Sequence, residues 1–218
     1  MMRFLEAVAA NNNRAWFQKN KAWYDDSRKY FEQLVEGLLV RIRQFDDTVA
    51  HLGVKDCTYR FYRDTRFSPD KAPYKRHFGA YICCGGRKSL MGGYYFHLQP
   101  GECMLASGTW YLPSDILKEV RMSVVEDLST FRGIVEVPEF KAVYPEMGMD
   151  FLKTLPRGFD KDFECPDYIR PRIYACMNKF DEALFDSPDA LDEIARRFQV
   201  GYPFIDFIND TIGDYSER

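Results

Sequence analysis

The chain is poor in the residues and spacings on which many metal and redox sites depend. It has three histidines and six cysteines among its 218 residues, and no two cysteines stand in a C-x-x-C arrangement. Cys83 and Cys84 are adjacent, so on a strand they would point to opposite faces of the sheet and could not bind one ion together. No histidine pair has the i, i+4 spacing of a helical metal site, so the spacing predicts no metal centre.

Long apolar runs are also missing, and the first residues do not have the pattern of a signal peptide. A membrane-spanning helix needs about 20 consecutive apolar residues, so we expect no membrane partner. Without an export signal, the chain is predicted to be cytoplasmic, with reduced thiols. Nothing in the sequence decides the oligomeric state.

The chain has neither a P-loop nor a dinucleotide fingerprint, and it lacks the G-x-S-x-G nucleophile elbow. Its glycine pairs, Gly85-Gly86 and Gly92-Gly93, are interpreted as hairpin glycines. Internal repeats, low-complexity tracts and linkers are missing as well. These absences exclude the common nucleotide-binding and serine-hydrolase motifs, and they leave the reaction class and any cofactor unknown.

Aromatic residues, in contrast, are abundant at 16% of the chain, with 14 tyrosines and 18 phenylalanines. Hydrophobic residues make up 46% and charged residues 29%, the profile of an ordinary globular protein that is long enough to bury a core. We expect some of the many rings to be half exposed, where they would line a cleft or an interface.

The apolar pattern predicts helices at both ends of the chain and strands between them. Apolar residues recur at spacings of three and four over residues 31–45, which indicates a long helix. Asn11, Asn12 and Asn13 would end one helix and cap the next. Strands are predicted over residues 58–66, 78–84, 94–99, 102–110 and 173–180, and later helices over residues 115–128, 129–145, 188–200 and 204–208. We therefore expect one α+β domain over residues 1–218, with helices flanking a mainly antiparallel sheet.

Charge is unevenly distributed along the chain, whose net charge is −3. Residues 55–88 carry nine Lys/Arg and three Asp/Glu, a net charge of +6, whereas residues 102–218 carry 13 and 23, a net charge of −10. The cations concentrate in residues 60–77, which we call the basic segment. It holds four arginines, two lysines and one histidine among two phenylalanines and two tyrosines. Such a segment either focuses a positive potential on a ligand or neutralises the acidic part of the chain.

The basic segment is the predicted site of a small anionic ligand that bears phosphate or carboxylate. Arginine presents a planar fork to such anions, and lysine adds a point charge. The residues predicted to hold the anion are Arg63, Arg66, Lys71 and Lys75, and those predicted to line the pocket are Tyr62, Tyr74 and Trp110. Asp64 belongs to the same candidate site and is the obvious internal partner of Arg66, because the two share a strand face. If every cation of the segment forms an ion pair with a carboxylate of the protein in this way, the segment is a structural network and has no ligand.

His77 and His97 are the candidates for proton transfer, because the ordinary pKa of histidine lies near neutrality. Strand alternation places Tyr95 and His97 on one face of the sheet. A two-residue turn after Gln99 would set His97 opposite Met104. His97 is accordingly the predicted acid–base residue. The alternatives are a structural role in the sheet and, more remotely, a metal ion held by His77 and His97 together with Asp64 or Glu102.

Two further functions are compatible with the basic segment. Cations interleaved with rings also bind single-stranded nucleic acid, with cations on the phosphates and rings on the bases. A small ligand is nevertheless the preferred candidate. The chain has 23 acidic residues after residue 101, which would repel nucleic acid, and it has no known RNA-binding motif. The other function is that of a non-catalytic interaction module, so the sequence does not decide whether the protein is an enzyme.

Five motifs give the chain a family resemblance. They are N-N-N-R-A-W-F (11–17), Y-R-D-T-R-F-S-P-D-K-A-P-Y-K (62–75), G-G-Y-Y-F-H-L-Q-P-G (92–101), G-T-W-Y-L-P (108–113) and P-R-G-F (156–159). In order and spacing they resemble the family called domain of unknown function 2461, along almost the whole chain. The resemblance implies a single full-length domain and adds Arg157 to the candidate ligand contacts. The family would have lysine there, so the charge is kept but the geometry of an anion contact would differ. No activity, substrate or cofactor follows from the resemblance.

Overall fold

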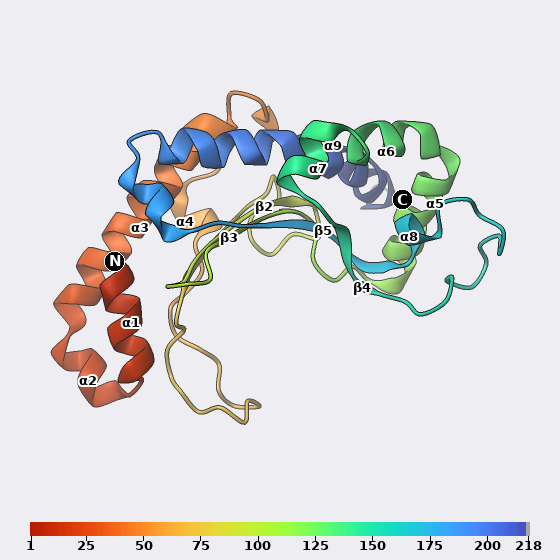
Figure 1. Ribbon diagram of the computed structural model, residues 1–218. Coiled ribbons are helices and arrows are strands. Elements are labelled where there is room, and N and C mark those ends of the chain that lie inside the picture. Colours follow the sequence, from red (N-terminus) through yellow and green to blue (C-terminus); the bar gives the residue numbers. More distant parts are fainter. Residues whose placement is uncertain (217–218) are drawn as a thin grey trace.

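The computed structural model describes the backbone of residues 1–216 and the side chains up to residue 213. Helices cover one side of a curved sheet (Figure 1). The helices are α1 (Met2–Ala10), α2 (Arg14–Lys19), α3 (Lys21–Ile42), α4 (Val54–Cys57), α5 (Ser114–Glu126), α6 (Leu128–Val135), α7 (Pro138–Val143), α8 (Pro166–Ile169) and α9 (Ala190–Ser216), with short 3-10 turns η1 (Asp47–Val49) and η2 (Glu182–Asp186). The strands are β1 (Phe78–Ile82), β2 (Gly93–Leu98), β3 (Met104–Gly108), β4 (Met147–Phe151) and β5 (Pro171–Lys179).

The five strands form an antiparallel sheet in the order β1-β2-β3-β5-β4. The first three strands follow one another along the chain as a meander, and β5 then pairs with β3. The register places His97 opposite Met104, as the short turn predicts. The α+β fold with a mainly antiparallel sheet is therefore confirmed.

Alternate residues of the strands give the sheet two unlike faces. One face packs against α3 and α9, and we call it the covered face. Its buried side chains from β1, β2 and β3 are Phe78, Ala80, Ile82, Tyr94, Phe96, Leu98 and Leu105. On β5 the same face contributes Tyr174 and Cys176 to a second apolar cluster, with α5, α6, α7 and α9. The hydrophobic core therefore lies on the helical side of the sheet.

No helix of residues 1–216 packs across the opposite face, which we call the open face (Figure 1). Its side chains come from the intervening strand positions, including Tyr81, Tyr95, His97 and Ala106. Two of these, Tyr81 and Tyr95, are only partly buried. None of the described helices is long and apolar enough to cross a membrane.

The C-terminal helix corrects one prediction. We expected Gly201 to end one helix and a second to follow, but α9 runs unbroken through Gly201 and Pro203. Gly201 serves packing instead, because a Cβ at this position would collide with the side chain of Ser107 on β3. The glycine lets the helix backbone approach the sheet closely.

The predicted strand over residues 58–66 is also wrong. This stretch has only isolated bridges, one of which joins Tyr62 to Tyr74. The Arg63 amide donates to the Pro73 carbonyl at 2.9 Å, so the basic segment pairs with itself. It projects from the sheet as a narrow ribbon (Figure 1).

Strand β4, in turn, was not predicted. Gly148 and Asp150 both have positive φ, and the pairing of β4 with β5 shifts register between Met147 and Met149. This irregularity removes the simple alternation by which a strand is recognised.

Candidate functional site

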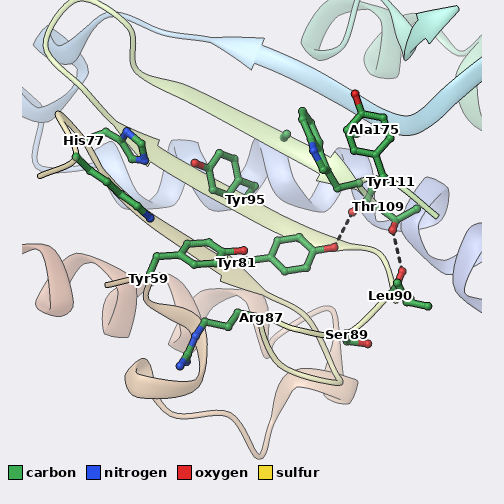
Figure 2. A pocket seen from close by; sticks show the side chains of 14 residues that line it. Tyr59, His77, Tyr81, Arg87, Ser89, Leu90, Tyr95, Thr109, Tyr111 and Ala175 are labelled. Carbon is green, nitrogen blue, oxygen red and sulfur yellow. Dashed lines mark hydrogen bonds between the residues drawn. The ribbon is translucent and has the colours of Figure 1, made fainter. Parts of the chain in front are cut away.

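A cavity of about 400 Å³ lies on the open face of the sheet. Figure 2 shows the side chains that project into it from the strands and the neighbouring loops. The lining residues are Tyr59, Lys75, His77, Tyr81, Arg87, Ser89, Leu90, Tyr95, Ala106, Gly108, Thr109, Trp110, Tyr111 and Ala175. The volume falls within the range of small-molecule sites, and five of the 14 lining residues are tyrosine or tryptophan.

Cross-strand pairing builds the floor of the cavity from rings on one side and small side chains on the other. Tyr81 lies opposite Tyr95, and Tyr95 lies opposite Ala106. Gly108 lies opposite Ala175. Gly108 has a φ of +127°, and a Cβ there would collide with a carbonyl of β5, so only glycine fits. The small residues leave a flat hollow beside the two tyrosines.

The rim loop over residues 89–92 is fixed by the cavity's own side chains. The Tyr81 hydroxyl lies 2.8 Å from the Met91 carbonyl and 2.9 Å from the Gly108 carbonyl, so its one proton is shared between the loop and β3. Thr109 Oγ1 donates to the Leu90 carbonyl at 2.8 Å (Figure 2). This wall of the cavity is therefore formed before any ligand arrives.

Tyr95 connects the cavity to a buried histidine. Its hydroxyl lies 2.9 Å from Nδ1 of His97, whose side chain is 8% exposed. The His97 ring in turn lies 4.3 Å, centroid to centroid, from the ring of His77, which lines the cavity. The structure thus brings the two predicted histidines together; His77 lines the cavity, whereas His97 does not and contacts it through His77 and Tyr95.

Burial decides the charge state of these groups. It lowers the pKa of His77 to about 3, with smaller contributions from His97 and Lys75, and it lowers the pKa of His97 as well. The same cause raises the pKa of Tyr95 to about 12. At pH 7 both imidazoles are neutral and the Tyr95 hydroxyl keeps its proton. The described residues contain no group of three or more His, Cys, Asp or Glu side chains that could hold a metal ion, so a metal on the two histidines lacks a third ligand.

Lys75 is the cation at the base of the basic segment, and it lines the cavity. Its ammonium lies 5.1 Å from the ring centroid of Tyr59. It forms no ion pair with a carboxylate in the part of the chain that the structure describes. Burial lowers the pKa of Lys75, and the nearby cations Arg60 and Arg28 lower it further. The positive charge of Lys75 is thus half-buried without a counter-charge.

Arg87 is the second cation of the cavity. Its guanidinium donates to the carbonyls of Lys55, at 2.5 Å, and Asp56, at 3.2 Å, near the C-terminal end of α4. These contacts fix the side chain, and no carboxylate among the side chains of residues 1–213 forms an ion pair with it. Sequence reasoning assigned Arg87 to a hairpin loop and did not select it.

In the outer part of the basic segment, the cations are bound by other groups of the same segment. Arg63 pairs with Asp70 at 2.5 Å, and Arg66 pairs with Asp64 through contacts of 3.0 and 2.7 Å. Lys71 donates to the Thr65 carbonyl at 3.0 Å. The predicted Asp64–Arg66 pair is therefore present. None of these side chains lines the cavity, and ligand binding by them stays a prediction.

The other predicted ligand contacts are scattered. Tyr74 is 2% exposed and stacks on Phe17 with ring centroids 3.9 Å apart, whereas Tyr62 is half exposed beside it. Trp110 lines the cavity and is 55% exposed. Arg157 is exposed on the loop between β4 and α8, at the other end of the sheet from the basic segment (Figure 1).

Of the predicted residues, the structure thus brings Lys75, His77 and Trp110 into one cavity, with His97 in contact with the lining residues His77 and Tyr95. The residues that sequence reasoning missed are Tyr59, Tyr81, Arg87 and Tyr111. Tyr81 and Tyr95 alternate with covered-face residues, which is a recognisable pattern, but no pattern in the sequence tells which face stays without helices.

Comparison with protein families matches residues 1–207 to the DUF2461 model, described as a conserved hypothetical protein. No curated protein and no solved structure matches the chain. The cavity is therefore the main source of any functional argument.

Proposed function

The chain belongs to the DUF2461 family of conserved hypothetical proteins, and we propose that it binds a small anionic ligand in the cavity on the open face of its sheet. The observation that carries this proposal is Lys75. Its charge is half-buried among aromatic rings and has no carboxylate partner among the described residues. Removing a charge from water without compensation is costly, and a bound anion would supply that compensation.

Arg87 supports the same reading. Arg87 lines the cavity, and its contacts with the carbonyls of Lys55 and Asp56 fix its side chain, so little side-chain freedom is lost when an anion binds nearby. Lysine and arginine together suit a carboxylate or a phosphate. The side chains of Ser89 and His77 add neutral polar groups at the cavity. The six cysteines are free thiols, which fits the cytoplasm as the proposed compartment.

The Tyr95–His97 pair gives the cavity a route for acid–base chemistry. Neutral His97 with its proton on Nε2 accepts a hydrogen bond at Nδ1 from the Tyr95 hydroxyl, at 2.9 Å. Tyr95 then presents an oriented oxygen to a bound ligand. In this proposal His97, the residue selected from the sequence, acts through Tyr95 and does not touch the ligand itself.

The test compares two lysines of the basic segment. Inorganic phosphate and succinate are titrated calorimetrically against the wild type, Lys75→Met and Lys71→Met. Loss of a charged hydrogen bond weakens binding roughly tenfold to a hundredfold, so we expect this loss for Lys75→Met. Lys71, which is tied to a backbone carbonyl outside the cavity, serves as the control and should leave affinity unchanged.

Equal losses of affinity in the two variants would show that the anion binds in the outer part of the basic segment and not in the cavity. If neither probe binds the wild type, and a thermal-shift screen of other phosphates and carboxylates is also silent, the anion-binding proposal is wrong. A ligand at 100 times its dissociation constant should stabilise the fold by about 2.7 kcal/mol, so binding is readily detected.

A further inference from the structure

From the shape of the cavity we infer that its ligand is a planar aromatic anion: one ring or two fused rings carrying a carboxylate or phosphate. This inference rests on the proposed anion site and specifies the body to which the anionic group is attached. It draws on three features of the cavity: the floor, the rim and the arrangement of its two ends.

The floor is flat where the ligand body would lie. Ala106, Gly108 and Ala175 occupy neighbouring open-face positions on β3 and β5, and all three are buried. Their side chains are at most one methyl group, so the surface there is close to the backbone itself. A flat ring can contact such a surface with its whole face, whereas a puckered or branched body touches it at a few atoms.

The rim carries two large rings that are more than half exposed. Trp110 is 55% exposed and Tyr111 is 60% exposed, and the two rings meet edge to face with centroids 5.9 Å apart. The backbone before them is fixed, because the Thr109 amide donates to the Tyr174 carbonyl at 2.8 Å. Adjacent exposed aromatic side chains at a concave site are typical of ligand or partner contacts.

The two ends of the cavity differ in chemistry. Figure 2 places His77 and Tyr59 at one end and Tyr111, Thr109 and Leu90 at the other, with Tyr95 and Tyr81 between them. Lys75 lies over the Tyr59 ring, so a positive charge stands at the first end. A ligand with its anionic group near Lys75 and its ring beneath Trp110 satisfies both ends. A volume of about 400 Å³ is near the lower limit of small-molecule sites, which suits one or two fused rings.

Three matched probes separate the charge from the ring. They are 2-naphthoate, the uncharged 2-naphthamide and the saturated decalin-2-carboxylate, and inorganic phosphate is titrated beside them. We expect 2-naphthoate to bind about tenfold or more tightly than either analogue. Trp110→Leu should weaken 2-naphthoate about tenfold and leave phosphate unchanged. Phe67→Leu is the control, since Phe67 is 93% exposed and lies outside the cavity.

Each contrary result identifies which idea is wrong. Equal affinities for 2-naphthoate and decalin-2-carboxylate, both lost in Lys75→Met, would overturn the aromatic class and leave the anion site standing. Equal affinities for 2-naphthoate and 2-naphthamide would overturn the anion site and leave the ring preference. If Phe67→Leu weakens 2-naphthoate as much as Trp110→Leu does, the ring lies elsewhere and the inference is wrong.

Discussion

At the scale of single residues, the cations of the basic segment differ in their burial and in their partners. Arg63 forms an ion pair with Asp70, and Arg66 forms one with Asp64. Such ion pairs at the surface contribute little to stability. Lys75 has no such partner among the described residues and is half-buried. Because an unpaired charge in a cavity is costly and a paired surface charge is not, we expect Lys75, and not Arg63 or Arg66, to bind an external anion. The pairing hypothesis thus holds for Arg63 and Arg66, whereas ligand binding at Lys75 stays a prediction.

His77 carries the clearest pH prediction at this scale. Burial lowers its pKa to about 3, whereas the unfolded chain titrates near 6.5. Between these values the unfolded state binds a proton that the folded state does not, so stability falls as the pH falls through this window. We expect the wild type to lose about 2 kcal/mol between pH 7 and pH 5 from His77 alone. Urea unfolding at the two pH values measures it.

His77→Gln should remove that part of the loss, and His51→Gln, at an exposed position, should not. The pKa of His97 is lowered by the same burial, so some pH dependence will remain in His77→Gln. A wild type and a His77→Gln variant with the same loss between pH 7 and pH 5 would show that His77 is not buried in the neutral form.

At the scale of elements, α9 determines which face of the sheet is closed. It lies across β3 and joins both apolar clusters, through Ile194, Phe198 and Ile205 to the first and Phe204 and Ile208 to the second. Its close approach to the sheet depends on Gly201, which lies against Ser107 and Tyr144. A residue that usually ends helices is here retained inside one for packing.

Two glycine substitutions test this role of α9. Gly201→Ala should destabilise the protein by about 1–3 kcal/mol, because the added methyl group overlaps the Ser107 side chain. Gly133→Ala, in α6 and with nothing within 4 Å of an added Cβ, should stabilise it by about 0.5–1 kcal/mol through helix propensity. Thermal and urea unfolding measure both. Similar effects of the two substitutions would mean that α9 does not contact β3 at Gly201.

At the scale of the whole molecule, the N-terminal helices and the basic segment support each other. Asn12 lies between α1 and α2, and its side-chain amide makes two hydrogen bonds to the backbone of Tyr74, at 3.0 and 3.1 Å. Phe17 of α2 stacks on the Tyr74 ring. These contacts join parts of the chain 62 positions apart and hold the ribbon beside the helices, as Figure 1 shows.

Removing this clamp should loosen the basic segment. Asn12→Ala deletes two partly buried hydrogen bonds, for an expected loss of about 1–3 kcal/mol. Limited trypsin digestion should then cut within residues 60–77 sooner than in the wild type. Asn11→Ala is the matched control, since its amide bonds only the nearby Ala7 carbonyl at an exposed site. Unchanged digestion in Asn12→Ala would show that the aromatic stack alone holds the segment.

The sequence by itself determined the fold class, most helices, the β1–β2–β3 meander and the Asp64–Arg66 pair, because these follow from local periodicity, caps and near neighbours. The sequence also selected Lys75, His77, His97 and Trp110 as candidate functional residues. Three outcomes were decided only by the tertiary structure. They are which cations form ion pairs, the continuation of α9 through Gly201, and which face of the sheet lacks helices. Those outcomes depend on contacts between residues far apart in the chain, and a cavity exists only where such contacts leave space. The same strand alternation fits either face, so the position of the helical layer, and with it the site, was not readable from the sequence.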